Sequence, residues 1–308
     1  MTGPGRAVNP FAVPGLGARS ARPLCPWQNA EHAHYYVGVD HTQEAFDRFV
    51  TEIGEPKELL NYGRIVVTSG PKGCGKSSVI NRCASWLQEE LKSARIGTHI
   101  VDLGGECSVA VNVGRRIGLV HEALVRELVN LKALAPSERL PSDAEGVYAQ
   151  ISDALDPRVV VAVILPPIDV MKELVSYSGL IRRKLVFFAE SNSSEAVASH
   201  RAQLRQTRQD EPIELSVGPL RAADFWTFVQ ARLAPRADRE PPPYAVTAAT
   251  MGQLSRNAGN LWSVRRLHAM LVGAYEAKLG EPQSDSELSA QEIEHFGVQM
   301  FLREEGHG

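Results

Sequence analysis

Apolar positions along the first two thirds of the chain fall into short runs separated by longer amphipathic segments. The runs read as buried strands and lie at residues 64–70, 95–103, 159–165, 184–191 and 212–217. Between them, apolar residues recur at helical spacing, as in 40–53, 76–92 and 117–134. Strands that alternate with helices predict an α/β fold with a parallel sheet covered by helices on both faces.

After residue 218 the pattern becomes entirely helical. Four segments carry apolar residues at helical spacing, and they lie at 221–233, 247–258, 261–279 and 288–305. Ser289 and Glu292 have the spacing of a capping box at the start of the last segment. An all-helical part is therefore expected to follow the α/β body.

The first 34 residues have a different composition. Five prolines and four glycines within residues 1–30 predict an extended arm rather than regular structure. The arm also carries the apolar anchors "NPF" (9–11) and "LCPW" (24–27), which we expect to dock on the body of the protein. The expected organisation is an arm at 1–34, an α/β domain at 35–218 and a helical part at 219–308.

Composition narrows the class of protein. The chain has 308 residues, of which 44% are hydrophobic and 22% charged, as in ordinary globular proteins. Its net charge of −3 supplies no overall basic field for nucleic acid. The sequence shows no apolar run of about 18 residues and no signal-peptide core, and its four cysteines form no C-x-x-C pair. We expect a cytoplasmic protein with reduced thiols and no membrane partner.

The segment "GPKGCGKS" (70–77) fits the P-loop motif G-x-x-x-x-G-K-[ST], with a strand before it and a helix after it. Glycines allow backbone N–H groups to curl round a phosphate, and the helix directs its positive end at the anion. Lys76 is expected to reach the β- and γ-phosphates, and the Ser77 hydroxyl to bind Mg²⁺. The predicted nucleotide-binding residues are Gly70, Pro71, Lys72, Gly73, Cys74, Gly75, Lys76, Ser77 and Ser78.

Cys74 allows two interpretations. A thiol at a helix N-terminus beside a lysine has a lowered pKa and is prone to oxidation. A small side chain that fills a permissive position is the simpler interpretation, and we favour it.

The order of these elements resembles that of AAA+ ATPases over residues 35–304. The segment 35–46, "YYVGVDHTQEAF", is similar to the stretch that lies near the adenine in the initiator and signal-transduction branches. "NPF" resembles a feature of bacterial AAA proteins of the secretion and transposition-regulator group. "FFAESN" (187–192) looks like the strand that ends in the sensor 1 residue, which makes Asn192 its match. The resemblance implies ATP and Mg²⁺ as ligands, and a helical lid.

Two later segments extend the resemblance. Residues 213–233 look like the last strand of the sheet followed by the entry to the lid. Residues 257–271, "NAGNLWSVRRLHAML", resemble the sensor 2 helix, whose arginine would fall three residues after Gly259. Trp262 stands there instead, and Arg265 and Arg266 lie one turn further on, either as imperfect substitutes or as a solvated helix face.

The segment "VILPPIDV" (163–170) occupies the place of the Walker B sequence, an apolar strand followed by Asp-Glu. On this resemblance Pro166 and Pro167 replace the acids that hold the magnesium shell and orient the attacking water, and Asp169 falls on a further acid. The prolines are expected to be harmless to the strand end. Three acids at other strand ends remain alternative sources of a carboxylate: Asp102, Glu106 and Glu190.

Two basic clusters are ambiguous. Arg201, Arg205 and Arg208 share one helical face, in the region where AAA+ proteins often keep the arginine finger that reaches a neighbour's γ-phosphate. We rank a solvated face first, then a finger, with Arg205 and Arg208 as candidates, then a nucleic-acid patch. The run 182–184 has the same three interpretations.

The sequence therefore predicts an ATP-binding, AAA+-like pseudo-ATPase with weak or absent hydrolysis, acting as a nucleotide-dependent assembly or regulatory module. The expected partners are further copies of the chain or another protein. One alternative is an active ATPase that remodels a protein or nucleoprotein complex with displaced acidic residues. Another is a nucleic-acid-associated regulator of the transposition type, which the absence of a winged-helix tail makes less favoured.

Overall fold

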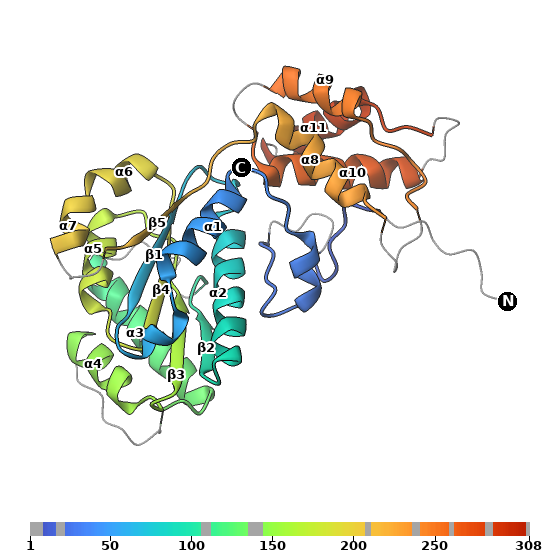
Figure 1. Ribbon diagram of the computed structural model, residues 1–308. Coiled ribbons are helices and arrows are strands. Elements are labelled where there is room, and N and C mark those ends of the chain that lie inside the picture. The colour runs from blue at the N-terminus through green and yellow to red at the C-terminus, as the bar shows by residue number, and fades with distance from the viewer. Residues whose placement is uncertain are drawn as a thin grey trace. The chain divides into compact units, whose positions relative to one another are not determined.

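The chain forms two compact units. A computed structural model describes residues 9–16, 22–105, 112–134, 144–206, 211–235, 241–258, 262–280 and 286–305. The α/β unit comprises Glu44–Pro71 and Lys76–Val217. The helical unit comprises Met1–Gln43, Lys72–Gly75 and Gly218–Gly308. Figure 1 labels the elements of both units.

The α/β unit is built on a five-stranded sheet in which every strand pair is parallel. The strands are β1 (Arg64–Ser69), β2 (Gly97–Asp102), β3 (Val159–Ile164), β4 (Leu185–Ser191) and β5 (Ile213–Ser216). Their order across the sheet is β2-β3-β4-β1-β5, so the strand that leads into the P-loop lies between β4 and β5. The predicted parallel sheet is confirmed.

Helices cover both faces of this sheet (Figure 1). They are α1 (Thr42–Ile53), α2 (Lys76–Ser93), α3 (Val113–Asn130), α4 (Ala144–Ala154), α5 (Met171–Leu180), α6 (Ser194–Ser199) and α7 (Arg201–Gln206), with a 3-10 turn, η2 (Pro56–Leu60), before β1. Two neighbouring residues of β4 show the division, because successive strand side chains point to opposite faces. Phe188 meets Phe49 of α1, whereas Phe187 meets Tyr148 of α4 and Tyr177 of α5.

Helix α3 begins and ends four residues earlier than the spacing of apolar residues predicts. The side chain of Asn112 caps its start by accepting a hydrogen bond from the N–H of Arg115 at 2.9 Å. At the other end Lys132 has a φ of 57°, and the N–H groups of Ala133 and Leu134 bond back to the Leu128 carbonyl. The caps, rather than the apolar pattern, set the limits of this helix.

The helical unit has one apolar core shared by its main helices. These are α8 (Ala222–Leu233), α9 (Ala248–Ala258), α10 (Val264–Gly280) and α11 (Ala290–Glu305), preceded by a 3-10 turn, η1 (Ala30–Tyr35). The predicted capping box is confirmed: Glu292 Oε2 accepts from the Ser289 N–H at 2.7 Å, and Ser289 Oγ accepts from the Glu292 N–H at 3.3 Å. In the described ranges no helix combines the length and apolar character needed to cross a membrane.

The "NPF" anchor docks on the helical unit, as the sequence predicts. Phe11 is completely buried in the core and meets the ring of Tyr275 edge-on, with centroids 5.7 Å apart. Asn9 Nδ2 donates to the Val272 carbonyl at 2.8 Å, and a ring nitrogen of His268 lies 2.9 Å from the Phe11 carbonyl oxygen. The arm therefore contributes both apolar area and hydrogen bonds to helix α10.

Asp40 is a completely buried carboxyl group in the same unit. Its Oδ2 accepts from the N–H of Val264 at the start of α10, and its Oδ1 has no hydrogen-bond partner among the described residues. Burial, helped by the charge of Asp224 and opposed by the Val264 hydrogen bond, raises the pKa of Asp40 to about 8. The group is therefore protonated in the folded protein at neutral pH.

Replacing Phe11 with alanine should destabilise the helical unit by about 3–5 kcal/mol, because the substitution leaves a cavity in its core. Thermal unfolding and limited proteolysis of the full chain measure the loss. Val298→Ala is the matched control, since Val298 lies on α11 of the same unit with 58% of its surface exposed. Equal unfolding temperatures for the wild type and Phe11→Ala would show that the arm contributes nothing to this core.

Asp40→Asn should stabilise the protein at pH 8 and change little near pH 4. With a pKa of about 8 in the folded protein and 3.8 for an unperturbed aspartate in the unfolded chain, the wild type loses stability as the pH rises from about 4 to 8. Each tenfold change in proton affinity is worth about 1.4 kcal/mol. Asparagine keeps the acceptor for Val264 and tolerates the φ of 56° at this position.

Melting temperatures at pH 4, 6 and 8 check this expectation, with the exposed Asp47→Asn as the control. A variant that is less stable than the wild type at pH 8 would show that the Asp40 carboxylate is charged and compensated.

Candidate nucleotide-binding site

The loop from Gly70 to Gly75 joins β1 to α2, which begins at Lys76, and this is the strand–loop–helix context that the motif requires. Gly70, Gly73 and Gly75 have φ values of 148°, 88° and 85°, which favour glycine. A Cβ at Gly70 would lie 2.3 Å from the Val217 carbonyl oxygen. Because the loop needs these glycines, the three together are not a chance feature of composition.

Lys76 is turned inward in this loop. It is 3% exposed, and its Nζ donates to the carbonyls of Gly70 and Pro71 at 2.9 Å each. The same nitrogen lies 3.6 Å from Oε1 of Glu190. Its positive charge is thus held among oxygen atoms at the position where the motif predicts contact with phosphate.

Ser77 follows in the first turn of α2, and its hydroxyl donates to Glu190 Oε2 at 2.6 Å. Glu190 lies on β4, directly opposite Thr68 of the neighbouring strand β1. The structure thus brings together the two P-loop side chains and one of the three acids that the sequence offered as alternatives. Glu190 is distinguished from the other two acids by the order of the strands in the sheet, which the sequence alone does not reveal.

The other two alternative acids differ from Glu190. Asp102 ends β2, which is separated from β1 by two strands, about 14 Å at the usual strand spacing. Its Oδ1 accepts from the Gly104 N–H at 2.9 Å. Glu106 lies outside the described residues. Asp169, after the prolines, is exposed.

The two prolines after β3 form a bulge in the pairing with β4. Leu165 donates to the Phe188 carbonyl, but the next bond runs from Ile168 to the carbonyl of Glu190. Three steps along one strand therefore match two along the other, because Pro167 lacks an N–H where the ladder calls for a donor. Pairing with β4 resumes one residue late, at Ile168, so the strand end accommodates both prolines by a shift of one residue.

Arg116 also fixes this bulge, and an ion pair in turn positions the arginine. Arg116 of α3 donates to the Pro167 carbonyl, and its Nε lies 3.0 Å from Oε1 of the buried Glu173. Burial raises the pKa of Glu173, while the Arg116 charge opposes that effect. The segment that the resemblance assigns to Walker B is thus fixed by backbone and arginine contacts and presents no side-chain carboxylate at Pro166 or Pro167.

The position expected for the sensor 2 arginine is part of the core of the helical unit. Trp262 is 7% exposed and packs on Phe225, with ring centroids 5.6 Å apart. Arg265 and Arg266 are exposed on α10, and the Arg266 guanidinium lies 5.0 Å from the Trp262 ring centroid. Gly259 lies outside the described residues.

The described side chains of the two basic clusters form ion pairs with acids or hydrogen bonds with backbone carbonyls. Arg201 pairs with Glu214 and Arg205 with Glu211, and Arg208 lies outside the described residues. In the second cluster Arg182 pairs with Glu145, Arg183 pairs with Asp153, and Lys184 Nζ donates to the Ser152 and Leu155 carbonyls. The contacts of Arg201 and Arg205 support the solvated-face interpretation for the first cluster, and the arginine finger stays a prediction. In the second cluster Lys184 is 4% exposed, so the solvated-face interpretation does not hold for this residue.

Of the remaining predicted site residues, Cys74 is 2% exposed, which fits a space-filling thiol better than a reactive one. Lys72 and Pro71 are exposed, and Ser78 is half-buried in the first turn of α2. Asn192 is exposed just after β4, so its sensor 1 role stays a prediction.

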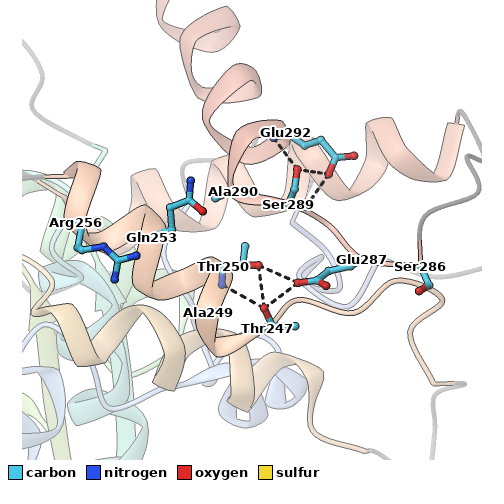
Figure 2. Close-up of a pocket in the computed structure, with 10 residues that line it drawn as sticks. All are labelled: Thr247, Ala249, Thr250, Gln253, Arg256, Ser286, Glu287, Ser289, Ala290 and Glu292. Atoms are coloured by element: carbon cyan, nitrogen blue, oxygen red, sulfur yellow. Dashed lines mark hydrogen bonds between the residues drawn. The ribbon is translucent and has the colours of Figure 1, made fainter.

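A separate cleft of about 860 Å³ lies within the helical unit (Figure 2). Figure 2 shows its polar groups bonded to one another: the Thr247 and Thr250 hydroxyls donate to Glu287 Oε1 at 2.8 and 3.1 Å. The Thr247 hydroxyl also accepts from the Thr250 N–H at the start of α9. The cleft lies along α9 and the start of α11, and these hydrogen bonds join the start of α9 to the segment that precedes α11.

Comparisons with known proteins agree with this architecture. No protein-family model and no curated protein sequence matches the chain. Among solved structures, the Aeropyrum pernix ORC1 protein in complex with DNA has a TM-score of 0.57 at 14% identity, covering 85% of this chain and 65% of that one. The Pyrobaculum aerophilum Cdc6p structure has a TM-score of 0.54 at 10% identity, covering 80% and 64%.

A third structure, the Aeropyrum pernix ORC2 protein in ADPNP–ADP complexes, has a TM-score of 0.52 at 15% identity, covering 83% of this chain and 67% of that one. The chain spans about two thirds of the length of these structures. At such low identity the similarity shows the fold alone. The protein therefore has the fold of the AAA+ ATPases, as the order of its sequence elements predicts.

Proposed function

We propose that the protein binds ATP with Mg²⁺ at the P-loop and hydrolyses it slowly or not at all. Nucleotide occupancy then controls its assembly with further copies of the chain, or its hold on a protein partner, in the cytoplasm. The observation that carries the proposal is a complete P-loop together with Pro166 and Pro167 at the end of β3, where the AAA+ resemblance places the catalytic acids.

The described residues fit a magnesium nucleotide. A glycine loop with positive φ values offers backbone N–H groups to an anion, and Lys76 supplies a positive charge. Ser77 supplies a hydroxyl oxygen, next to the Glu190 carboxylate. Mg²⁺ prefers oxygen ligands and is usually bound through one or two carboxylates together with substrate phosphates. ATP is inferred from the AAA+ fold and from the adenine nucleotides named for the ORC2 structure.

We infer slow hydrolysis because, among the described residues, no acid stands at the positions of Pro166 and Pro167 after β3. Loss of a positioned general base costs about 10²–10⁴-fold in rate. The chain that passes the Walker B position is fixed by the Ile168 N–H and by Arg116, neither of which accepts a proton from water. On the AAA+ resemblance Trp262 also stands where the sensor 2 arginine is expected, and its ring is part of the core of the helical unit.

One observation favours the alternative of an active ATPase that remodels a complex. Glu190 is an acid displaced to the neighbouring strand, and it already touches the P-loop hydroxyl. For rapid hydrolysis this one carboxylate would have to orient the attacking water, and it cannot readily do so while it binds a metal ion.

A nucleic-acid-associated role is favoured by one comparison, because the ORC1 structure of similar fold is a complex with DNA. The arginines of both basic clusters in the described ranges are already paired with acids. Binding to duplex DNA that weakens steeply with salt would support this role over the first one.

Lys76→Ala should abolish the stabilisation of the protein by ATP. A ligand at a hundred times its dissociation constant stabilises the folded state by about 2.7 kcal/mol, and the variant loses the cation that holds the phosphates. Melting temperatures with and without ATP and Mg²⁺ measure the effect. Lys92→Ala is the control, because this exposed lysine lies about 24 Å along the same helix. A variant that keeps the full shift would refute the P-loop assignment.

Phosphate release by the wild type should be at least about a hundredfold below the ~1 s⁻¹ at the low end of ordinary enzymes. The reason is the missing acid pair after β3. A coupled phosphate assay with Lys76→Ala as the blank measures it. Turnover near 1 s⁻¹ that disappears in the blank would establish the active-ATPase alternative instead.

A further inference from the structure

Glu190 makes contacts that the proline-containing Walker B segment cannot make. It lies on β4 beside the P-loop strand, and both of its carboxylate oxygens face P-loop side chains: Oε2 is 2.6 Å from Ser77 Oγ and Oε1 is 3.6 Å from Lys76 Nζ. Its side chain is 20% exposed, so one side remains open to solvent. An ion or ligand has access to it.

The distance between Ser77 Oγ and Glu190 Oε2 is close to the spacing of two oxygen ligands around a small divalent cation. Mg²⁺ binds its ligands at 2.0–2.1 Å in an octahedron, which places neighbouring ligand oxygens about 2.9 Å apart. The Ser77 hydroxyl and the Glu190 carboxylate are 2.6 Å apart, within a few tenths of an ångström of that value. A small movement of one side chain would let both contact one ion.

We propose that Glu190 holds Mg²⁺ together with Ser77, and thereby replaces the carboxylate that Pro166 has removed from the end of β3. The proposal rests on the proposed function, since the metal ion arrives with the nucleotide. The acid that holds the metal ion then lies on β4, which is next to β1 in the sheet, rather than at the end of β3.

Glu190 has a second task in the same geometry. In the empty loop it neutralises Lys76, whose ammonium group is almost completely buried and would otherwise be compensated only by two carbonyls. When phosphates engage Lys76, the carboxylate is released from the lysine and becomes available to the metal ion. One acid thus compensates the cation of the empty loop and holds the metal ion of the filled loop.

The test measures ATP affinity by calorimetry for the full chain, once with Mg²⁺ and once with EDTA. We expect wild-type ATP to bind at least tenfold more tightly with Mg²⁺. In Glu190→Gln this gain should fall to less than threefold, because removing an acid that holds or orients a metal typically costs 10–100-fold in metal affinity. Glu195→Gln is the control, since Glu195 is an exposed acid at the start of α6.

The EDTA arm separates a metal-binding role from a structural one. Without metal, Glu190→Gln should bind ATP as tightly as the wild type or more tightly, because a negative charge near the phosphates has been removed. A variant that binds more weakly in both arms would show that Glu190 supports the loop only, and would overturn the proposal. A variant that keeps the full magnesium gain would overturn it as well.

A conservative variant covers the case in which glutamine leaves Lys76 uncompensated and the loop misfolds. Glu190→Asp keeps the charge on a shorter side chain, so its magnesium gain should lie between those of the wild type and Glu190→Gln. Mn²⁺ bound with ATP, followed by electron paramagnetic resonance, should show the same ranking. An aspartate variant that ranks with the wild type in both measurements would contradict a distance-dependent metal ligand. If wild-type ATP binds in neither arm, the proposed function itself fails.

Discussion

A buried ammonium group needs oxygen atoms around it, and much of the geometry near the P-loop follows from the way Lys76 obtains them. Two of them are the Gly70 and Pro71 carbonyls of its own loop, which requires the chain between Pro71 and Lys76 to curl back toward these groups. The third comes from Glu190 on a different strand, so β4 must lie directly beside β1 with Thr68 opposite Glu190. The register of one strand pair therefore fixes the electrostatics of the loop.

The position of β4 is also constrained along its other edge, where it pairs with β3. The Glu190 carbonyl accepts from Ile168 because Pro167 has no N–H to give. The main chain of Glu190 is thus held by the bulge while its side chain is held by the P-loop. Substituting acids for the prolines would offer the ladder a new donor at residue 167, and the pairing that now includes the bulge would compete with a regular one.

Much of this fold could be predicted from the sequence because its signals are local. The five apolar runs, the capping box at Ser289 and the glycines of the P-loop each act within a few residues, and the structure confirms all of them. The limits of α3 were wrong by four residues because the Asn112 cap outweighed the apolar pattern. The "NPF" segment with Phe11 was expected to dock on the body of the protein, but the sequence could not say on which helices.

The candidate site was predictable only in part, for a physical reason. Lys76 and Ser77 belong to a motif whose spacing is fixed by the loop, whereas Glu190 is 113 residues away from Ser77 in sequence. Its contact depends on strand order, and three acids at strand ends were equivalent until that order was known. Likewise, the arginines of the clusters at 182–184 and 201–205 carry no sign in the sequence that acids nearby in space already pair with them.

The docked "NPF" segment has a consequence for the order in which the protein folds during synthesis. Asn9 bonds to Val272, a separation of 263 residues, so this apolar anchor leaves the ribosome long before its binding site on α10 does. At about 5–20 residues per second, translation of the intervening chain takes roughly 13–50 s. The α/β unit ends at Val217 and can complete its sheet during that interval. The helical unit, by contrast, cannot complete its core until α10 has emerged. Until then the phenyl ring of Phe11 is exposed, and a chaperone or a second nascent chain can bind it.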